Sequence, residues 1–266
     1  MSQRVRKVYL SSAFRKSGTP SSFRIEIPQD VELGPDSHVA VSDCIIPHSW
    51  YNIQEGVNSK LYIRQGSTNR VVEVESGHYT ASSLAARLAL KLNAVAAGGT
   101  SFTVSGPTST INKLTITEAG GSGFLVYADS VLKGDGPIGE SPIVNPQSLN
   151  SYLNVEPMTA QVTSWQSGYI SLLRITEVYV RSPDLAAFDT VDSMGRRDVL
   201  KKVAVDKEHG YLIVSPSTYE LSDLSKVSGN LRSMHFELTD NHGNLIQMQA
   251  QDWSLSLNIV SGVGGT

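Results

Sequence analysis

The chain contains little cysteine, little charge and no long apolar run. Its 266 residues include one cysteine, which excludes an intramolecular disulfide framework. No apolar run approaches the roughly 18 residues that a membrane-spanning helix needs, so we expect no membrane span. The first residues, MSQRVRKVYLSSAF, lack the apolar core of a secretory signal. We therefore expect synthesis inside a cell, without secretion through a signal peptide.

Charged residues make up 18% of the chain, against roughly 25% in an ordinary globular protein, and the formal net charge is -3. This charge balance argues against a surface that binds nucleic acid or anionic membrane over the whole chain, because such binding surfaces need clustered Lys and Arg. The start of the chain is the exception, because the residues before Glu26 include none that is acidic. The basic side chains of interest there are Arg4, Arg6, Lys7, Arg15 and Lys16. We predict a basic N-terminal arm at residues 1–22, which is either a solvated segment or a contact for an acidic partner.

Most of the chain alternates apolar and polar residues with a period of two, which indicates strands with one buried face. In FRIEIP, at 23–28, the apolar residues share one face, and the final proline is expected to end the pairing of the strand. From Trp253 to Ile259, apolar residues again occupy every other position. DNHGN, at 240–244, is typical of a tight hairpin turn, because Asn and Gly adopt positive φ readily. The chain is therefore predicted to be mainly β, a jelly roll or a related β-sandwich.

One segment departs from this pattern and predicts a helix. In YTASSLAARLALKLNAV, leucines recur every four residues from Leu84 to Leu92, and Thr80 can cap the first turn. Residues 98–123 then predict a hairpin, with GPTSTINK between its two strands. Residues 130–160 are rich in Gly, Pro, Ser and Asn, which favours an irregular loop or a small subdomain.

Cys44 and His48 raise the question of a thiolate beside an imidazole, which is a common catalytic pair. On an extended strand, however, a four-residue offset separates two Cα atoms by roughly 13 Å. We predict that Cys44 is a buried structural residue on the same strand face as Ile46. A hydrolase that used the pair would lose turnover on thiol alkylation; we do not favour it, and we assign no catalytic residue.

The remaining motifs give weak signals. GDGPIG, at 134–139, has the glycine spacing of a dinucleotide-binding loop, but prolines rather than a helix follow it, so we predict a plain loop. The six histidines contain no pair at the spacing that aligns zinc ligands, and we predict no metal site and no cofactor. Four aromatic residues could line a ligand cleft, although packing is the more common role for aromatic side chains at strand ends. They are Trp50, Tyr51, Tyr179 and Phe188.

Five stretches, taken in order, resemble a known family. They are SSAFRKSGTPSSFRIEIP, VAVSDCIIPHSWYNI, VVEVESGHYTASSLAARLALKLN, EVYVRSPDLAAFDT and LRSMHFELTDNHGNLIQMQAQDWSLSLNI. Together they resemble the penton proteins, the vertex minor capsid proteins of Polinton-like, adintovirus-like and virophage-type DNA viruses. The adenovirus penton base is more remotely similar. The resemblance extends from about Val8 to Ile259, and it depends on the order and combination of stretches that are each a simple β pattern.

The resemblance implies a single jelly roll at a fivefold vertex of an icosahedral capsid, with five copies in a ring and an insertion on the outward side. We place the jelly-roll β-sandwich at residues 23–75 and 161–266, and a smaller inserted α+β or β subdomain at 76–160. The helix and the loop-rich segment support this division, because they lie between two ends that are dense in strands. A closed ring requires two different contact faces on each copy.

The implied partners are further copies of the chain in a homopentamer, a major capsid protein of the double jelly-roll type, and a protein attached at the vertex. The implied location is the virion, and the five basic residues of the arm become candidate contacts with the capsid or the genome. Genome contact is expected only through that arm. The chain has no Arg-Gly-Asp motif, so attachment through integrins is not supported. The alternative function is a β-sandwich host-attachment or lectin-like module, which should offer a cleft with aromatic and polar side chains.

Overall fold

The structure is a computed structural model, and it describes residues 3–108, 111–134, 143–185, 191–192, 194–216 and 225–262. The chain divides into two compact units, of which the first combines Met1–Trp50 with Ile175–Thr266 and the second is Tyr51–Arg174. The inserted unit therefore begins earlier and ends later than the predicted 76–160. The difference arises because the strands at 60–73 and 164–166 pair within the inserted unit rather than with the jelly roll.

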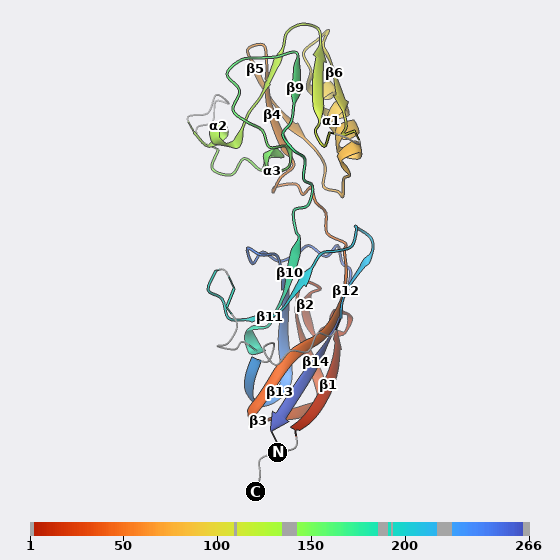
Figure 1. Ribbon diagram of the computed structural model, residues 1–266, viewed down its shortest axis with the longest axis vertical. Helices are drawn as coiled ribbons and strands as arrows, with labels where there is room; N and C mark the ends of the chain where they lie inside the picture. Colours follow the sequence, from red (N-terminus) through yellow and green to blue (C-terminus); the bar gives the residue numbers. More distant parts are fainter. Residues whose placement is uncertain are drawn as a thin grey trace. The chain divides into compact units, whose positions relative to one another are not determined.

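The first unit is an antiparallel sheet of eight strands (Figure 1). Its strands are β1 (Gln3–Ser11), β2 (Ser17–Thr19), β3 (Ser22–Pro47), β10 (Glu177–Arg181), β11 (Val199–Ala204), β12 (Leu212–Ser215), β13 (Ser225–Thr239) and β14 (Ser254–Gly262). The order is β1-β14-β3-β13-β10-β11, and β2 and β12 also pair with β3. Two short 3-10 helices accompany the strands, η1 (Ser12–Phe14) and η2 (Pro183–Leu185).

The long strand β3 joins the two halves of this sheet. Its residues from Ser22 to Val39 pair with β13, with irregularities in the register. Its residues 38–45 pair with β14, while β12 lies on the other side of residues 44–47. The strand continues past Pro28, where the sequence predicted an end to pairing. The register instead shifts between Leu231 and Ser233 of β13, opposite the stretch that contains Pro28, so a local irregularity accommodates the proline.

A single apolar core shows that the sheet folds over on itself. Strands from both ends of the order, β1 and β11, place buried side chains in the same cluster as the central strand β3. Phe23 lies near the middle of this core, with its ring centroid 5.8 Å from that of Phe236 and 5.7 Å from that of Trp253. The predicted mainly β fold is therefore confirmed: the unit is a jelly-roll-like sandwich with all its strands antiparallel.

The predicted free arm at residues 1–22 is wrong for most of its length. β1 pairs with β14 over nine positions, from Gln3 opposite Gly262 to Ser11 opposite Ser254. Leu10 is buried in the core, and the backbone N–H of Ser12 donates to the carbonyl of Trp253 at 2.9 Å. VRKVYL, at 5–10, does not alternate apolar and polar residues, because Val5 and Tyr9 lie on the exposed face and Arg6 lies on the same face as Leu10.

The turn at 240–244 forms as expected, but the hairpin does not extend. Gly243 has φ 82°, and the backbone N–H of Asp240 donates to the carbonyl of Asn244 at 2.9 Å. Gln249 and Ala250 then adopt positive φ, which interrupts the second run until β14 begins. β14 pairs with β1 and β3 rather than with β13, and its alternate residues from Leu255 to Ile259 are buried as the sequence predicted.

The inserted unit has its own strands, helices and core (Figure 1). One sheet has the order β5-β4-β8 and the other β6-β7-β9. Its elements are β4 (Lys60–Gln65), β5 (Thr68–Glu73), α1 (Ala81–Val95), β6 (Ser101–Ser105), β7 (Thr115–Ala119), β8 (Phe124–Val126), α2 (Asp129–Lys133), α3 (Asn150–Leu153) and β9 (Ser164–Gln166). The predicted hairpin is β6 and β7, and the loop-rich segment contains α2 and α3.

Helix α1 forms as its sequence predicted. The Thr80 side chain accepts from the backbone N–H of Ser83, and the Ser83 hydroxyl accepts from the backbone N–H of Thr80. This reciprocal capping box satisfies two donors that the first turn would otherwise leave unpaired. Leu84, Leu88 and Leu92 are fully buried on the face that packs into the core of the unit.

A buried ion-pair network holds the segment after β10 in the first unit. Arg181 is 1% exposed, and its guanidinium donates to Asp192 and Asp198 at 2.6 Å each and to the Thr239 hydroxyl at 2.8 Å. Asp192 also accepts from the Arg196 side chain at 2.9 Å and from two backbone N–H groups. The bond from Arg181 is the main reason that the pKa of Asp192 lies well below its ordinary value of 3.8.

The two leucines Leu88 and Leu90 of α1 provide a matched test of the inserted core. Leu88 is fully buried and Leu90 is 63% exposed. We expect Leu88→Ala to lower the free energy of unfolding of the inserted unit by roughly 2–5 kcal/mol, because it leaves a cavity. Leu90→Ala should change it by at most about 0.5 kcal/mol. Urea denaturation of the full chain, followed by the far-ultraviolet signal of the helix, measures both, and equal effects would contradict the packing described.

Arg181→Met should destabilise the first unit, because Asp192, Asp198 and Thr239 all lose the guanidinium that donates to them. The control is Lys202→Met, which removes an exposed ion pair with Glu177. It should leave the midpoint of urea denaturation nearly unchanged. Because the pKa of Asp192 is depressed, its contribution is present above about pH 4 and is lost as the pH falls. The difference between wild type and Arg181→Met should therefore shrink in acid, and a constant difference would contradict the assignment.

Candidate functional site

The strand β1 forms one edge of the first unit and carries exposed apolar side chains. It pairs with β14 on one side, and no described strand pairs with its other side. Val5 is 61% exposed, Tyr9 75%, and Phe14 of the adjoining η1 81%. An unpaired edge with outward apolar residues is a surface that proteins normally cover by contact with another element or another chain.

The edge at β12 is the counterpart on the far side of the same layer, whose strand order is β1-β14-β3-β12. Leu212 and Val214 are each 55% exposed, and Tyr211, just before the strand, is 63% exposed. Val214 lies opposite Ile45 of β3, which is also exposed, while Ile213 points into the core. The end strand β11 differs, because it carries Lys201 and Lys202, a common protection of an edge against pairing.

The five basic residues do not gather into one basic patch. Lys7 pairs with Asp43 at 3.1 Å, Arg15 with Asp252 at 2.7 Å and Lys16 with Glu26 at 2.7 Å. Arg6 is half-buried on β1, and the side chain of Arg4 lies outside the described residues.

These carboxylates hold the basic side chains against their own chain. Arg15 also donates to the carbonyl of Ser12 at 2.7 Å. Burial raises the pKa of Asp43, but bonds from Ser256 and Lys7 outweigh it, and the pKa lies below its ordinary value. Much of the positive charge of these three residues is thus offset locally.

Cys44 and His48 are not arranged as a catalytic pair. Cys44 is fully buried on the core face of β3, and burial raises the pKa of its thiol to about 11. The ring of His48 packs 4.3 Å from that of Trp50, and its Nδ1 donates to the carbonyl of Lys207 at 2.7 Å. Burial also lowers the pKa of His48, so it is neutral at physiological pH. The thiol is therefore protonated and inaccessible.

The aromatic candidates that the structure describes differ in burial. Trp50 is buried, Tyr51 is half-buried, and Tyr179 is half-buried with its hydroxyl 2.9 Å from Glu177. Phe188 and the GDGPIG motif after Gly134 lie outside the described residues. No group of three or more His, Cys, Asp or Glu side chains in the described ranges could hold a metal ion. Within the same ranges, no helix is long and apolar enough to cross a membrane.

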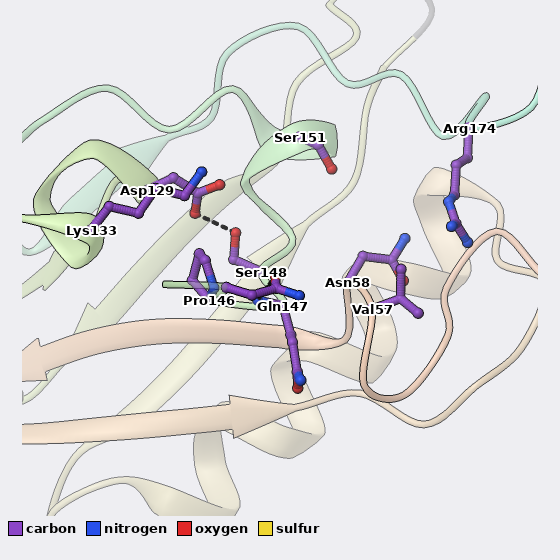
Figure 2. Close-up of a pocket in the computed structure, with 10 residues that line it drawn as sticks. Val57, Asn58, Asp129, Lys133, Pro146, Gln147, Ser148, Ser151 and Arg174 are labelled. Atoms are coloured by element: carbon purple, nitrogen blue, oxygen red, sulfur yellow. Dashed lines mark hydrogen bonds between the residues drawn. The ribbon is translucent and has the colours of Figure 1, made fainter. Parts of the chain in front are cut away.

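The inserted unit contains a polar pocket of about 310 Å³ that sequence reasoning missed. Its ten lining residues are Val57, Asn58, Asp129, Lys133, Asn145, Pro146, Gln147, Ser148, Ser151 and Arg174. Figure 2 shows Asp129 and Lys133 on one side of the space, Arg174 and Asn58 on the other, and Ser151 pointing between them. These residues come from four separate segments of the sequence, so no local sequence motif indicates the pocket.

Hydrogen bonds to β4 and to the unit's interior preorganise the pocket wall. The Tyr62 hydroxyl donates to the carbonyl of Pro146 at 2.9 Å, and the backbone N–H of Lys60 donates to the carbonyl of Gln147 at 2.9 Å. Asn58 is buried and donates to the hydroxyl of Tyr152 at 2.8 Å. Burial raises the pKa of Tyr152 to about 12, so this hydroxyl stays protonated.

Comparison with known proteins bears on the fold. No protein-family model and no curated protein matches the chain. A crystal structure of the mavirus penton protein does match, over 98% of this chain and 100% of that one, with a TM-score of 0.53. The two proteins share a fold. Their sequences are 12% identical, so the likeness concerns the arrangement of strands and not particular side chains.

Cys44→Ser should fold and destabilise the first unit by roughly 1–3 kcal/mol, because the serine hydroxyl is buried with imperfect pairing. In the native wild type, Cys44 should react with iodoacetamide far more slowly than after denaturation, because the thiol is buried and protonated. Tyr211→Cys in the Cys44→Ser background supplies an exposed reference thiol. If native Cys44 were alkylated as fast as this reference, the structural role of Cys44 would be refuted.

Proposed function

We propose that the chain is a structural virion protein, a minor capsid protein of the penton type that forms closed rings of five at the fivefold vertices of an icosahedral DNA-virus capsid. The observation that carries the proposal is the fold, which matches a penton protein along nearly the whole of both chains, inserted unit included. Its role is structural rather than catalytic, because the one candidate catalytic pair is a buried thiol and a packed imidazole.

The two exposed edges of the first unit serve as the contact faces of the ring. A closed ring needs a heterologous contact, in which one face of a copy meets a different face of the next. The β1 edge, with Val5 and Tyr9, and the β12 edge, with Leu212 and Val214, are two such faces on opposite sides of one layer. Burying these side chains between copies removes apolar surface from water and stabilises the ring.

The further partners in this proposal are a major capsid protein of the double jelly-roll type and a protein attached at the vertex. The basic residues of the first segment are proposed to contact the capsid; among those whose side chains the structure describes, Arg6 takes part in no described ion pair. The alternative, a host-attachment or lectin-like module, has one observation in its favour, which is the polar pocket of the inserted unit.

The proposal is tested by placing a charge on each edge. Tyr9→Glu and Val214→Glu should each greatly reduce the amount of this chain at capsid vertices, because the carboxylate would be buried in an apolar contact. Cryo-electron microscopy of particles assembled with the major capsid protein measures this occupancy. Particles are the right sample, because interfaces below about 1,200 Å² are often transient between free subunits.

Leu90→Glu is the control, because it adds the same charge at an exposed leucine of the inserted unit and should leave occupancy unchanged. Wild-type density at quasi-sixfold positions, or its absence from the shell, would overturn the penton assignment. Full occupancy by both edge variants would overturn the assignment of the contact faces alone.

A further inference from the structure

The pocket of the inserted unit has an unusual distribution of charge. Arg174 is half-buried at one side, and its guanidinium donates to the Gln54 side-chain carbonyl at 2.9 Å. Among the described residues, no carboxylate pairs with Arg174, whose described side-chain partner is the neutral Gln54. A partly desolvated guanidinium with spare donors is suited to hold a ligand carboxylate, because its planar fork matches that geometry.

The opposite side of the pocket accepts hydrogen bonds. One oxygen of Asp129, Oδ1, accepts from the Ser148 hydroxyl and from the side-chain amide of Asn150 at 2.7 Å. The other oxygen, Oδ2, has no described donor. Because Asp129 is held in place by these two bonds, Oδ2 is a fixed acceptor for a ligand hydroxyl. The exposed ammonium of Lys133 lies on the same side of the pocket and adds a donor for a ligand hydroxyl (Figure 2).

Neutral polar groups fill the space between the two ends. Ser151 has an exposed hydroxyl that points into the pocket, and Gln147 is a further lining residue whose side chain extends away from Ser151 (Figure 2). The volume of about 310 Å³ lies at the lower end of the range for ligand pockets, which fits one sugar ring rather than a chain of several. No aromatic residue is among the lining residues, so weak binding is expected.

We propose that this pocket binds a sugar acid, a single ring that carries one carboxylate and several hydroxyls. Arg174 holds the carboxylate, while Asp129 and Ser151 bond the hydroxyls. The site goes beyond the proposed capsid role and does not rest on it, because all its lining residues belong to the inserted unit. Such a ligand occurs at the ends or within the chains of acidic glycans, which would make the pocket a point of attachment to a glycan-coated surface.

The test uses the isolated full chain and four probes. Glucuronate and glucose differ in one carboxylate, N-acetylneuraminate carries its carboxylate on a different ring, and inorganic sulfate is an anion without the ring. Titration followed by protein chemical shifts should show saturable glucuronate or N-acetylneuraminate binding in the millimolar range. Glucose and sulfate should each bind at least tenfold more weakly, and the shifted resonances should map to the lining residues.

Three variants separate recognition from folding. Arg174→Gln should weaken sugar-acid binding at least tenfold with little effect on glucose. Ser151→Phe, which fills the pocket and leaves the Arg174 bond to Gln54 intact, should abolish binding of every probe. The control is Arg64→Gln, an exposed arginine of β4 outside the pocket, and it should bind like wild type.

Three outcomes would overturn the proposal. The first is the absence of saturable sugar-acid binding at tens of millimolar, and the second is equal affinity for glucose or sulfate. The third is binding that Ser151→Phe leaves intact. None of them changes vertex occupancy, so failure here is distinguishable from failure of the capsid proposal.

Discussion

The pairing of β3 with its neighbours on both sides is the constraint on which the first unit depends. This strand lies next to β13 and β14 along the sheet and also holds β2 and β12. Because side chains alternate between faces, a slip of one residue in β3 would turn its own buried side chains outward and misalign it with every neighbour. The core cluster around Phe23, Phe236 and Trp253 therefore fixes the register of strands that are far apart in sequence.

The edges of the molecule follow from this arrangement. With β3, β13 and β14 inside the sheet, β1 and β12 are left with one side unpaired in the described part of the chain. Their outward apolar residues have no place in the monomer's core, because the same strands already contribute Leu10 and Ile213 to it. Lys7, Arg15 and Lys16 form ion pairs within their own chain. The exposed apolar side chains, rather than these charges, are therefore the main feature of the β1 edge.

The inserted unit has an apolar core of its own, distinct from the core of the sandwich. It buries its own apolar cluster, and its helix α1 and both its sheets are complete within Tyr51–Arg174. A unit with its own core can change its surface residues without disturbing the strands of the other unit. The polar pocket lies wholly in this unit, so the proposed ligand site and the proposed contact edges belong to different units of the chain.

The sequence by itself determined the local elements, because alternation and helical periodicity are written in neighbouring residues. The strand faces from Leu255 to Ile259, the capped helix at 81–95 and the buried Cys44 were all predictable in this way. Only the tertiary structure decided that β14 pairs with β1 and β3, that the insertion begins at Tyr51, and that Lys7 faces Asp43. It alone also brought Arg174 and Asp129 to one pocket. These contacts join residues that are far apart in the sequence, from 36 positions for Lys7 and Asp43 to more than 240 for β1 and β14. Many strands of the chain have similar alternating patterns. The packing of the whole core decides which of them pair, and no local pattern encodes that packing.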